Sequence, residues 1–293
     1  MTRAGFVALA GRPNVGKSTF VNAALGEKVT IVSDRPQTTR RAIRGVYNAP
    51  DSQLVLVDLP GVQRPRDALT ARMAHRVQQE LEGADAALLM LAGEQGVGPG
   101  DRFIARALAQ AGPPVTIAVN KIDRLSQAAL LDTLARASEL DGQAEVFPIS
   151  ARTGAGVQAL LEHLCALMPQ APFMFPADAR SDQPLALALA ELIREAVIRR
   201  TFHELPHAVE VTVEEIEHPR AGLVRVRALI LVESDSQKGI LIGAGGAMIK
   251  AIGTAARREL QRVLDSQVHL DLSVRVRRDW RGDEAMLDRL GIG

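Results

Sequence analysis

The sequence is poor in cysteine, in aromatic residues and in net charge. Its single cysteine, Cys165, cannot form an internal disulfide, so we expect a small core residue in a reducing compartment. Aromatic residues make up 3% of the chain, which argues against the ring-stacking platforms with which RRM and OB folds bind nucleic acids. The formal net charge is +1, so any basic surface must be local.

The sequence also lacks the marks of a membrane or metal protein. No hydrophobic run approaches the length of a membrane span, and the N-terminus lacks the layout of a signal peptide. The six histidines show no ligand spacing with cysteine or carboxylate residues, which argues against a transition-metal site. We therefore expect a cytoplasmic protein without stable membrane insertion. The sequence leaves open a peripheral association with the inner membrane, although no basic amphipathic helix supports it.

With 293 residues, 47% of them apolar, the chain can bury two cores. Over residues 1–170, short apolar strands alternate with helical patterns, which predicts an α/β domain with a mostly parallel sheet and helices on both faces. The expected strands are 6–10, 54–57, 86–91, 115–119 and 145–149, with 42–47 as an antiparallel edge strand, and the expected helices lie near 17–25, 67–82, 101–111, 126–139 and 156–168.

A change of composition marks the end of this domain. Four prolines flank a polar stretch, which predicts a linker over 171–183. Residues 184–293 then predict an α+β domain, with a helix over 185–201, strands near 209–213 and 224–232, two helices around the glycines at 243–246, and a last strand over 268–276. This order resembles a type II KH domain, a single-stranded RNA-binding module.

The octapeptide that begins at Gly11 and ends at Ser18 follows an apolar strand and precedes a helix, which is the context of a phosphate-binding loop. Its backbone N–H groups would surround the phosphates, Lys17 would place its ammonium between the two terminal phosphates, and Ser18 would hold Mg²⁺. The predicted nucleotide contacts of this segment are Gly11, Arg12, Pro13, Asn14, Val15, Gly16, Lys17, Ser18 and Thr19.

A tetrapeptide after the fourth parallel strand, Asn120-Lys121-Ile122-Asp123, predicts the base. The Asp123 carboxylate can accept two hydrogen bonds from guanine, whereas adenine would leave it buried and unpaired. Asn120 would brace the loop and the stem of Lys121 would lie along the base. The segment Ser150-Ala151-Arg152 would cap the guanine oxygen with its backbone.

Two segments are predicted to sense the terminal phosphate. In Asp58-Leu59-Pro60-Gly61, Asp58 would hold Mg²⁺ through water and the amide of Gly61 would contact the phosphate. Thr39, in the stretch Gln37-Thr38-Thr39-Arg40, would complete the metal shell with Ser18 and Asp58. We therefore predict Lys17, Thr39 and Gly61 as the catalytic residues.

The predicted RNA site centres on the glycines at 243 and 246, which would let a nucleic-acid backbone approach two helix ends. Residues 238–281 hold nine basic residues against four acidic ones. The predicted RNA contacts are Lys238, Gly243, Ala244, Gly245, Gly246, Ile249, Lys250, Arg257, Arg275 and Arg277. Trp280 can be interpreted either as a base-stacking residue or as a hydrophobic anchor for the C-terminal segment.

Together with the segment His203-Glu204-Leu205-Pro206-His207, these motifs resemble those of the Era family of ribosome assembly GTPases over nearly the whole length. The resemblance implies GTP and GDP as ligands, Mg²⁺ as cofactor, and binding to the 3′ end of 16S rRNA during assembly of the 30S subunit. Three positions bear on this comparison. Leu59 stands where many relatives carry Thr, Ala244-Gly245 stands where many carry a lysine, and Val62 stands where many small GTPases carry glutamine.

Because valine cannot orient water, we expect slow intrinsic hydrolysis, on the order of minutes to hours per turnover. Relatives with Asn at the position of Asn14 resemble potassium-stimulated GTPases, so K⁺ is included as a second cation. The main hypothesis is a GTP-hydrolysing switch that binds RNA. The alternatives are an RNA-binding module with a structural nucleotide, and a small-molecule kinase, which the guanine-reading segment argues against.

Overall fold

The computed structural model describes residues 2–32, 39–61, 66–202 and 205–292. Within them the chain forms two compact units. The first comprises residues up to 182 except 67–69, and the second comprises 67–69 and 183–292. Each unit has its own sheet.

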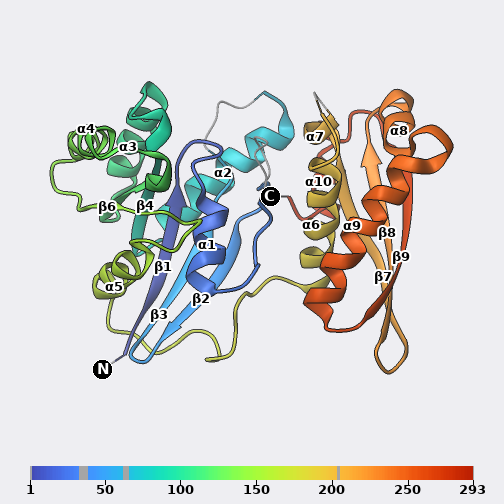
Figure 1. Cartoon of the computed structure of the whole chain (residues 1–293), viewed down its shortest axis with the longest axis horizontal. Helices are drawn as coiled ribbons and strands as arrows, with labels where there is room; N and C mark the ends of the chain where they lie inside the picture. The colour runs from blue at the N-terminus through green and yellow to red at the C-terminus, as the bar shows by residue number, and fades with distance from the viewer. Residues whose placement is uncertain (1, 33–38, 62–65, 203–204, 293) are drawn as a thin grey trace. The chain divides into compact units, whose positions relative to one another are not determined.

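The first unit is built on a six-stranded sheet in the order β2-β3-β1-β4-β5-β6 (Figure 1). Its strands are β1 (Arg3–Ala10), β2 (Ile43–Ala49), β3 (Ser52–Asp58), β4 (Ala86–Ala92), β5 (Val115–Asn120) and β6 (Val146–Pro148). All neighbours pair in parallel except β2, which pairs antiparallel with β3 at the edge. The predicted α/β class and the antiparallel edge strand are confirmed.

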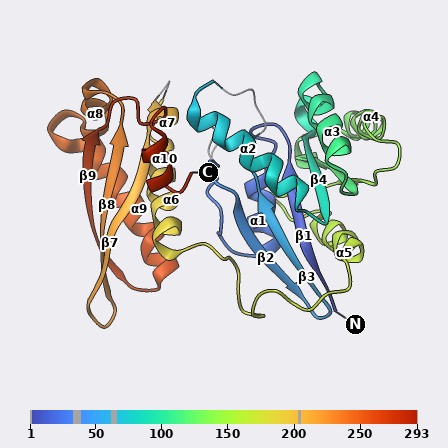
Figure 2. The same cartoon turned by 180° about the vertical axis from the view of Figure 1, so that it is seen from behind.

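Helices cover both faces of this sheet (Figure 2). Side chains of α1 (Lys17–Leu25) and α5 (Val157–Leu167) share a core with Val7 and Leu9 of β1. Side chains of α2 (Ala68–Glu82), α3 (Pro99–Ala111) and α4 (Gln127–Ser138) share the opposite core with Ala8 and Ala10. Successive residues of a strand point to opposite faces, so a strand covered on both sides must be apolar throughout, as β4 is.

The predicted boundaries agree with these elements within a few residues. Two short 3₁₀ helices, η1 (Gly93–Gln95) and η2 (Ile122–Arg124), were not predicted. Each lies immediately beyond the carboxyl end of a strand, where three residues are too few to show a hydrophobic period.

The segment after α5 is irregular, as its prolines predict, but it is fastened to the first unit. The backbone N–H of Val46 donates to the Arg180 oxygen at 2.9 Å. The buried amide of Gln53 accepts from the N–H of Met174 at 2.8 Å and donates to the Phe175 oxygen at 2.9 Å. The segment up to 182 therefore packs along the β2 and β3 edge.

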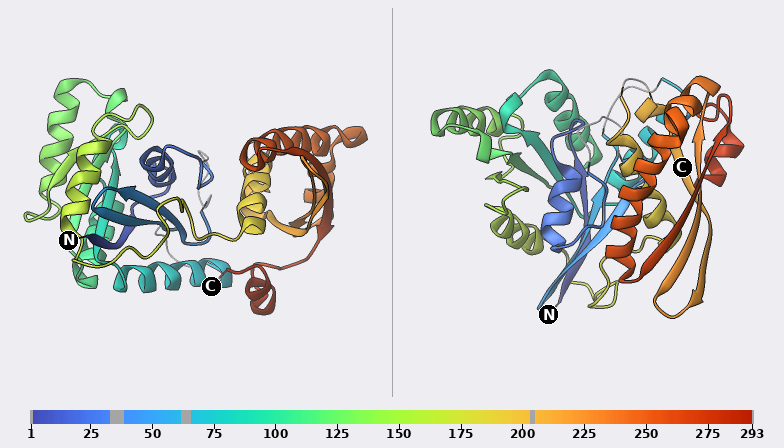
Figure 3. Two further views of the ribbon diagram at one scale, coloured as in Figure 1. Left: turned by 90° about the horizontal axis from the view of Figure 1, so that it is seen from below. Right: turned by 45° about the vertical axis from the view of Figure 1, so that its right-hand side comes forward.

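The second unit has a three-stranded sheet in the order β7-β8-β9, with β7 and β8 antiparallel and β8 and β9 parallel. Its helices α6 and α9 lie on one face of the curved sheet (Figure 3, left panel). The elements are α6 (Leu185–Ile198), α7 (Leu205–Ala208), β7 (Glu210–Arg220), β8 (Leu223–Val232), α8 (Asp235–Ile242), η3 (Ala244–Gly246), α9 (Ala247–Leu264), β9 (Gln267–Val276) and α10 (Glu284–Arg289). Apart from the short additions α7 and α10, this is the predicted order.

Helical spacing explains the core of this unit. Leu189, Ile193 and Val197 recur every four residues on α6, and Ile252, Ala256 and Leu260 do so on α9, and all six are buried. Trp280 is fully buried as well, and its indole N–H donates to the Ala208 oxygen at 3.0 Å. Of its two interpretations the anchor is correct, because a buried ring cannot stack on a base.

Cys165 of α5 is half-buried against the core of the first unit, and burial raises the pKa of its thiol. Along the described part of the chain, no single helix has both the length and the apolar character needed to cross a bilayer. The bent pair formed by Asp235–Ile242 and Ala244–Leu264 meets those two criteria only when its halves are taken together.

Candidate functional site

The carboxyl ends of the parallel strands gather the predicted nucleotide residues at one edge of the sheet. Gly11 follows β1, Leu59 follows β3, Lys121 follows β5 and Ile149 follows β6. The sheet order reverses direction around β1, with β3 on one side and β4 on the other. In open α/β sheets, ligands bind beyond the carboxyl ends at such a point.

The loop after β1 has the backbone of a phosphate-binding loop. Gly11, Asn14 and Gly16 have φ values of 151°, 65° and 103°. A Cβ on Gly16 would lie 2.2 Å from the side-chain nitrogen of Asn120, so only glycine fits this position. Gly16 caps the N-terminus of α1, which directs the first N–H groups of that helix toward the loop.

Lys17 lies on the inner side of this loop. Its ammonium donates to the backbone oxygens of Gly11 at 3.2 Å and Arg12 at 3.4 Å, and the side chain is buried. Burial lowers the pKa of Lys17, and the charge of Asp58 opposes that shift in part. A buried ammonium held by carbonyl oxygens is well suited to pair with a polyphosphate.

Three oxygen-bearing side chains meet beside Lys17. The Ser18 hydroxyl donates to Asp58 Oδ2 at 2.6 Å and lies 3.3 Å from the Thr39 hydroxyl, which itself donates to Asp58 Oδ2 at 3.3 Å. Two hydroxyls and a carboxylate form the hard oxygen set that Mg²⁺ prefers, so these residues fit the ion. Ser18, Thr39 and Asp58 would hold it directly or through water, where it would neutralise phosphate charge.

Asn120 joins the base-reading loop to the phosphate loop. Its buried amide donates to the Val15 oxygen at 2.8 Å and accepts from the N–H groups of Lys121 at 2.8 Å and Ala151 at 2.9 Å. One side chain therefore fixes three of the predicted segments relative to one another.

The Asp123 carboxylate stands at the base end of the site. It accepts from the Ser150 hydroxyl at 2.5 Å and contacts the Arg152 guanidinium. The hydrogen bond from Ser150 is the largest cause that lowers the pKa of Asp123, so the group is ionised at neutral pH. An ionised carboxylate is the acceptor that the paired N–H groups of guanine require.

A cavity of about 290 Å³ lies between these groups. Its lining is Asn14, Gly16, Thr19, Val32, Asn120, Lys121, Asp123, Arg124, Ala151 and Arg152. Two of these, Val32 and Arg124, were not predicted.

Glu94, which follows β4, was also missed. It binds the ammonium of Lys121 and accepts from Arg124 at 2.8 Å, and these two contacts lower the pKa of Glu94. The position of Glu94 just beyond the carboxyl end of β4 could have indicated that it lies near the site.

Some of the predicted nucleotide residues direct their side chains to other parts of the first unit. The Arg12 side chain is directed to helix α3, where it pairs with Asp101 at 2.8 Å. Leu59 and Pro60 are buried, and Leu59 belongs to the hydrophobic core. Gly61 approaches Pro13, since a Cβ on Gly61 would lie 3.0 Å from the Pro13 ring. Gln37, Thr38, Val62, His203 and Glu204 lie outside the described residues.

The predicted RNA turn has the conformation that its glycines allow. Gly243, Gly245 and Gly246 have φ values of 71°, 57° and 79°. A Cβ on Gly243 would lie 2.9 Å from the Met248 nitrogen, whereas Cβ atoms on Gly245 and Gly246 would meet no other atom within 4 Å. The turn thus presents an open backbone before the N-terminus of α9, where N–H groups can meet phosphate.

The predicted basic contacts divide between two surfaces. Lys250 and Arg257 are exposed on α9, which begins at the turn. Arg275 is exposed on β9, and Arg277 is exposed just after this strand ends at Val276. Arg275 alternates with the residues that face α9, since a Cβ on Gly253 of α9 would lie 3.5 Å from Leu272. Arg277 also pairs with Asp283 at 2.8 Å, which neutralises part of its charge.

Comparisons with known proteins agree with both units. The family model described as "50S ribosome-binding GTPase" matches residues 6–121, and the model described as "KH domain" matches residues 204–281. Fold and site therefore define a P-loop GTPase joined to a KH domain.

Curated relatives give the family. "GTPase Era" of Mycobacterium tuberculosis is 43% identical over 295 residues, covering 98% of each chain. "GTPase Era" of Lacticaseibacillus paracasei is 44% identical over 287 residues, covering 98% of this chain and 96% of its own. This chain belongs to the Era GTPase family and hydrolyses GTP.

Two solved structures cover the whole chain. One is Era in complex with MgGDPNP and nucleotides 1506–1542 of 16S ribosomal RNA, with a TM-score of 0.96 and 34% identity over 100% of both chains. The other is Aquifex aeolicus Era bound to GDP.AlF4−, with a TM-score of 0.96 and 33% identity over 100% of both chains. The predicted combination of the two folds is confirmed.

Proposed function

We propose that this GTPase binds single-stranded RNA at the 3′ end of 16S rRNA and acts in assembly of the 30S ribosomal subunit. The glycine turn at 243–246 carries this proposal, because it offers an uncrowded backbone and a helix N-terminus to an RNA phosphate. The relative crystallised with nucleotides 1506–1542 of 16S rRNA supports the choice of RNA. The RNA-binding module is proposed to span residues 184–293.

We assign Ser18, Thr39 and Asp58 to Mg²⁺, and the relative crystallised with MgGDPNP supports this choice. Asn14, which has a φ of 65° and lines the nucleotide cavity, is the residue that would favour K⁺ as a second cation. We expect faster GTP turnover in KCl than in NaCl at equal ionic strength. Equal rates in both salts would remove potassium from the mechanism.

The cytoplasm is the proposed location, because ribosomal subunits are assembled there. A peripheral association with the inner membrane is a separate proposal with a direct test. Sedimentation with anionic lipid vesicles in GTP and in GDP measures it, and a protein that stays in the supernatant in both would exclude it.

The proposed switch works through the segments at 33–44 and 58–66, which carry Thr39 and Gly61. Terminal phosphate would draw both residues toward the metal and the phosphate, and its loss would release them. The alternative is an RNA-binding module in which the nucleotide is only structural. The two differ in whether RNA affinity depends on the third phosphate.

The deciding experiment measures the affinity of the full chain for a fluorescent oligonucleotide of the 16S rRNA 3′ end. We expect binding to differ between a non-hydrolysable GTP analogue and GDP, and expect Lys17→Ala to lose that difference. Equal affinities in wild type would favour the alternative. Co-sedimentation with purified 30S and 50S subunits tests which subunit the protein binds. The comparison is needed because the matching family model carries the description "50S ribosome-binding GTPase".

Gly246→Asp tests the RNA site itself. A side chain at this position meets open space, and aspartate is among the residues that tolerate a positive φ such as the 79° of Gly246, so the variant should fold. Its carboxylate then stands where phosphate must approach. Gly222, which is exposed between β7 and β8, has a φ of 74° and would also direct a Cβ into open space, so Gly222→Asp provides a matched control. We expect RNA affinity to be lost in Gly246→Asp and largely kept in the control. Unchanged affinity in Gly246→Asp would mean that RNA binds elsewhere.

A further inference from the structure

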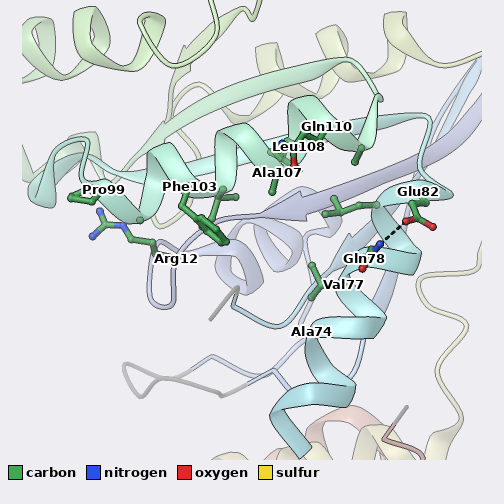
Figure 4. Close-up of a pocket in the computed structure, with 14 residues that line it drawn as sticks. Arg12, Ala74, Val77, Gln78, Glu82, Pro99, Phe103, Ala107, Leu108 and Gln110 are labelled. Carbon is green, nitrogen blue, oxygen red and sulfur yellow. Dashed lines mark hydrogen bonds between the residues drawn. The ribbon is translucent and has the colours of Figure 1, made fainter. Parts of the chain in front are cut away.

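The Arg12 side chain belongs to a different surface from the nucleotide cavity. It lines a groove of about 800 Å³ between α2 and α3, and it is absent from the lining of the nucleotide cavity. Figure 4 shows Arg12 at one end of this groove beside Pro99, with Gln78 and Glu82 at the other end. A residue of the phosphate loop thus extends its charge outward, away from the phosphates.

At that end of the groove, Arg12 meets a rigid partner. Its Nε lies 2.8 Å from Asp101 Oδ1, and a terminal guanidinium nitrogen donates to the Gly96 oxygen at 3.4 Å. Asp101 is fully buried, and its other oxygen accepts from the Gly98 N–H at 2.8 Å, which caps α3. Both carboxylate oxygens are therefore used.

The neighbouring backbone is shaped to admit this side chain. A Cβ on Gly100 would lie 2.9 Å from Arg12 Cδ, so a larger residue in the first turn of α3 would displace the arginine. Arg12 also precedes Pro13, which restricts Arg12 to extended conformations. The contact with Gly100 therefore restrains the side chain of Arg12, and Pro13 restrains its backbone.

The backbone of Arg12 and the following Pro13 lie against Lys17 and Gly61, two of the predicted catalytic residues. The Arg12 oxygen accepts from the Lys17 ammonium at 3.4 Å, and a Cβ on Gly61 would lie 3.0 Å from the Pro13 ring. The far end of the loop is held separately, by the bond from Asn120 to the Val15 oxygen at 2.8 Å. The loop therefore has two external supports, one from the base-reading loop and one from α3.

We propose that Arg12 and Asp101 are positioning residues for GTP hydrolysis. Their ion pair holds the first half of the phosphate loop against α3 and so sets where Lys17 and Gly61 meet the terminal phosphate. A buried carboxylate that loses its cation is strongly unfavourable, which makes the pair a firm support. Gly61 and part of the Lys17 charge would act on the terminal phosphate, which GDP lacks, so the loss should reduce turnover more than GDP affinity.

The test compares single-turnover GTP hydrolysis and GDP affinity in Arg12→Ala, Asp101→Asn and the double variant. We expect each single variant to lower the hydrolysis rate about tenfold, since small misplacements of reacting groups have effects of this size. GDP affinity should change by less than about threefold, because the pair acts on the position of the hydrolysing groups and not on contacts that GDP and GTP share. Asp101→Asn keeps an acceptor for the Gly98 N–H, so α3 stays capped.

Two comparisons separate positioning from mere stability. The double variant should be no slower than the slower single variant, because residues that act as one unit are not additive. Arg12→Lys, which keeps a cation beside Asp101, should hydrolyse GTP at a rate between wild type and Arg12→Ala. Arg102→Ala, at an exposed arginine of the same helix, is the matched control and should leave hydrolysis unchanged.

Three results would overturn the proposal. The first is wild-type hydrolysis in both Arg12→Ala and Asp101→Asn. The second is full additivity in the double variant. The third is an equal loss of GTP and GDP affinity with an unchanged single-turnover rate. That result would mean that the ion pair stabilises the folded loop but does not position the groups that act in hydrolysis.

Discussion

The side-chain nitrogen of Asn120 lies 2.8 Å from the backbone oxygen of Val15. This bond joins the base-reading loop after β5 to the phosphate loop after β1, across a sequence separation of 105 residues. The segment that binds the base and the segment that binds the phosphates are thus held at a fixed distance by one buried amide.

Replacing Asn120 by alanine should weaken both the fold and nucleotide binding. Three partners would lose their hydrogen bonds, two of which are buried, and each unsatisfied buried group costs about 1–3 kcal/mol. We expect a lower melting temperature and weaker binding of GTP and GDP alike, measured by thermal unfolding and calorimetry. Asn48→Ala, which removes a bond to the Ala179 oxygen outside the site, should keep nucleotide affinity. Unchanged nucleotide binding in Asn120→Ala would show that the bond is dispensable.

Asp123→Asn should change which base is bound. An amide offers one donor and one acceptor where the carboxylate offers acceptors only, so the variant should weaken GTP binding and favour xanthosine triphosphate. Competition between the two nucleotides measures the preference. Asp132→Asn, at an exposed aspartate of α4, should keep the preference for GTP. A variant at 123 that still selects GTP would refute the base-reading role.

Nucleotide affinity should fall as pH rises through the alkaline range below 10.5, the usual pKa of lysine. Burial lowers the pKa of Lys17 in the folded chain, and only the charged ammonium pairs with phosphate. Over that interval the unfolded chain binds more protons than the folded one, so the Lys17 contribution to the free energy of unfolding without nucleotide rises with pH.

Calorimetry in buffers of different ionisation enthalpy should therefore detect proton uptake when GTP binds. Lys17→Met, which carries no titrating group, should bind GTP weakly and without that uptake. Proton uptake that persists in Lys17→Met would assign it to another residue.

Trp280→Ala should destabilise the second unit by about 3–5 kcal/mol, the usual cost of truncating a buried tryptophan. Trp280→Phe, which keeps most of the volume and loses the bond to Ala208, should cost about 1 kcal/mol. Chemical unfolding measures both. RNA affinity should be unchanged in folded Trp280→Phe, and a selective loss of RNA binding there would revive a stacking role.

The fold class and the nucleotide motifs could be predicted from the sequence, because both depend on short-range patterns. An apolar strand covered on both faces, such as β4, has to be apolar at every position, and a phosphate loop needs glycine where φ is positive and a Cβ would clash, as at Gly16. Val224, Val226 and Ile230, all of them buried, alternate along the predicted strand 224–232 and mark its buried face. Such rules act within a few residues and can be recognised without knowing the neighbours.

Contacts between residues that are remote in the sequence could not be predicted and became visible in the folded chain. The tertiary structure directed Arg12 to Asp101, 89 residues away, and placed Arg275 on the face of β9 opposite the helix that carries Arg257. It also made Trp280 a buried anchor and brought Glu94 to Lys121. Hydrogen bonds and ion pairs depend on distances of a few ångströms, and those distances between remote segments are set by strand order and helix packing, which no local pattern specifies.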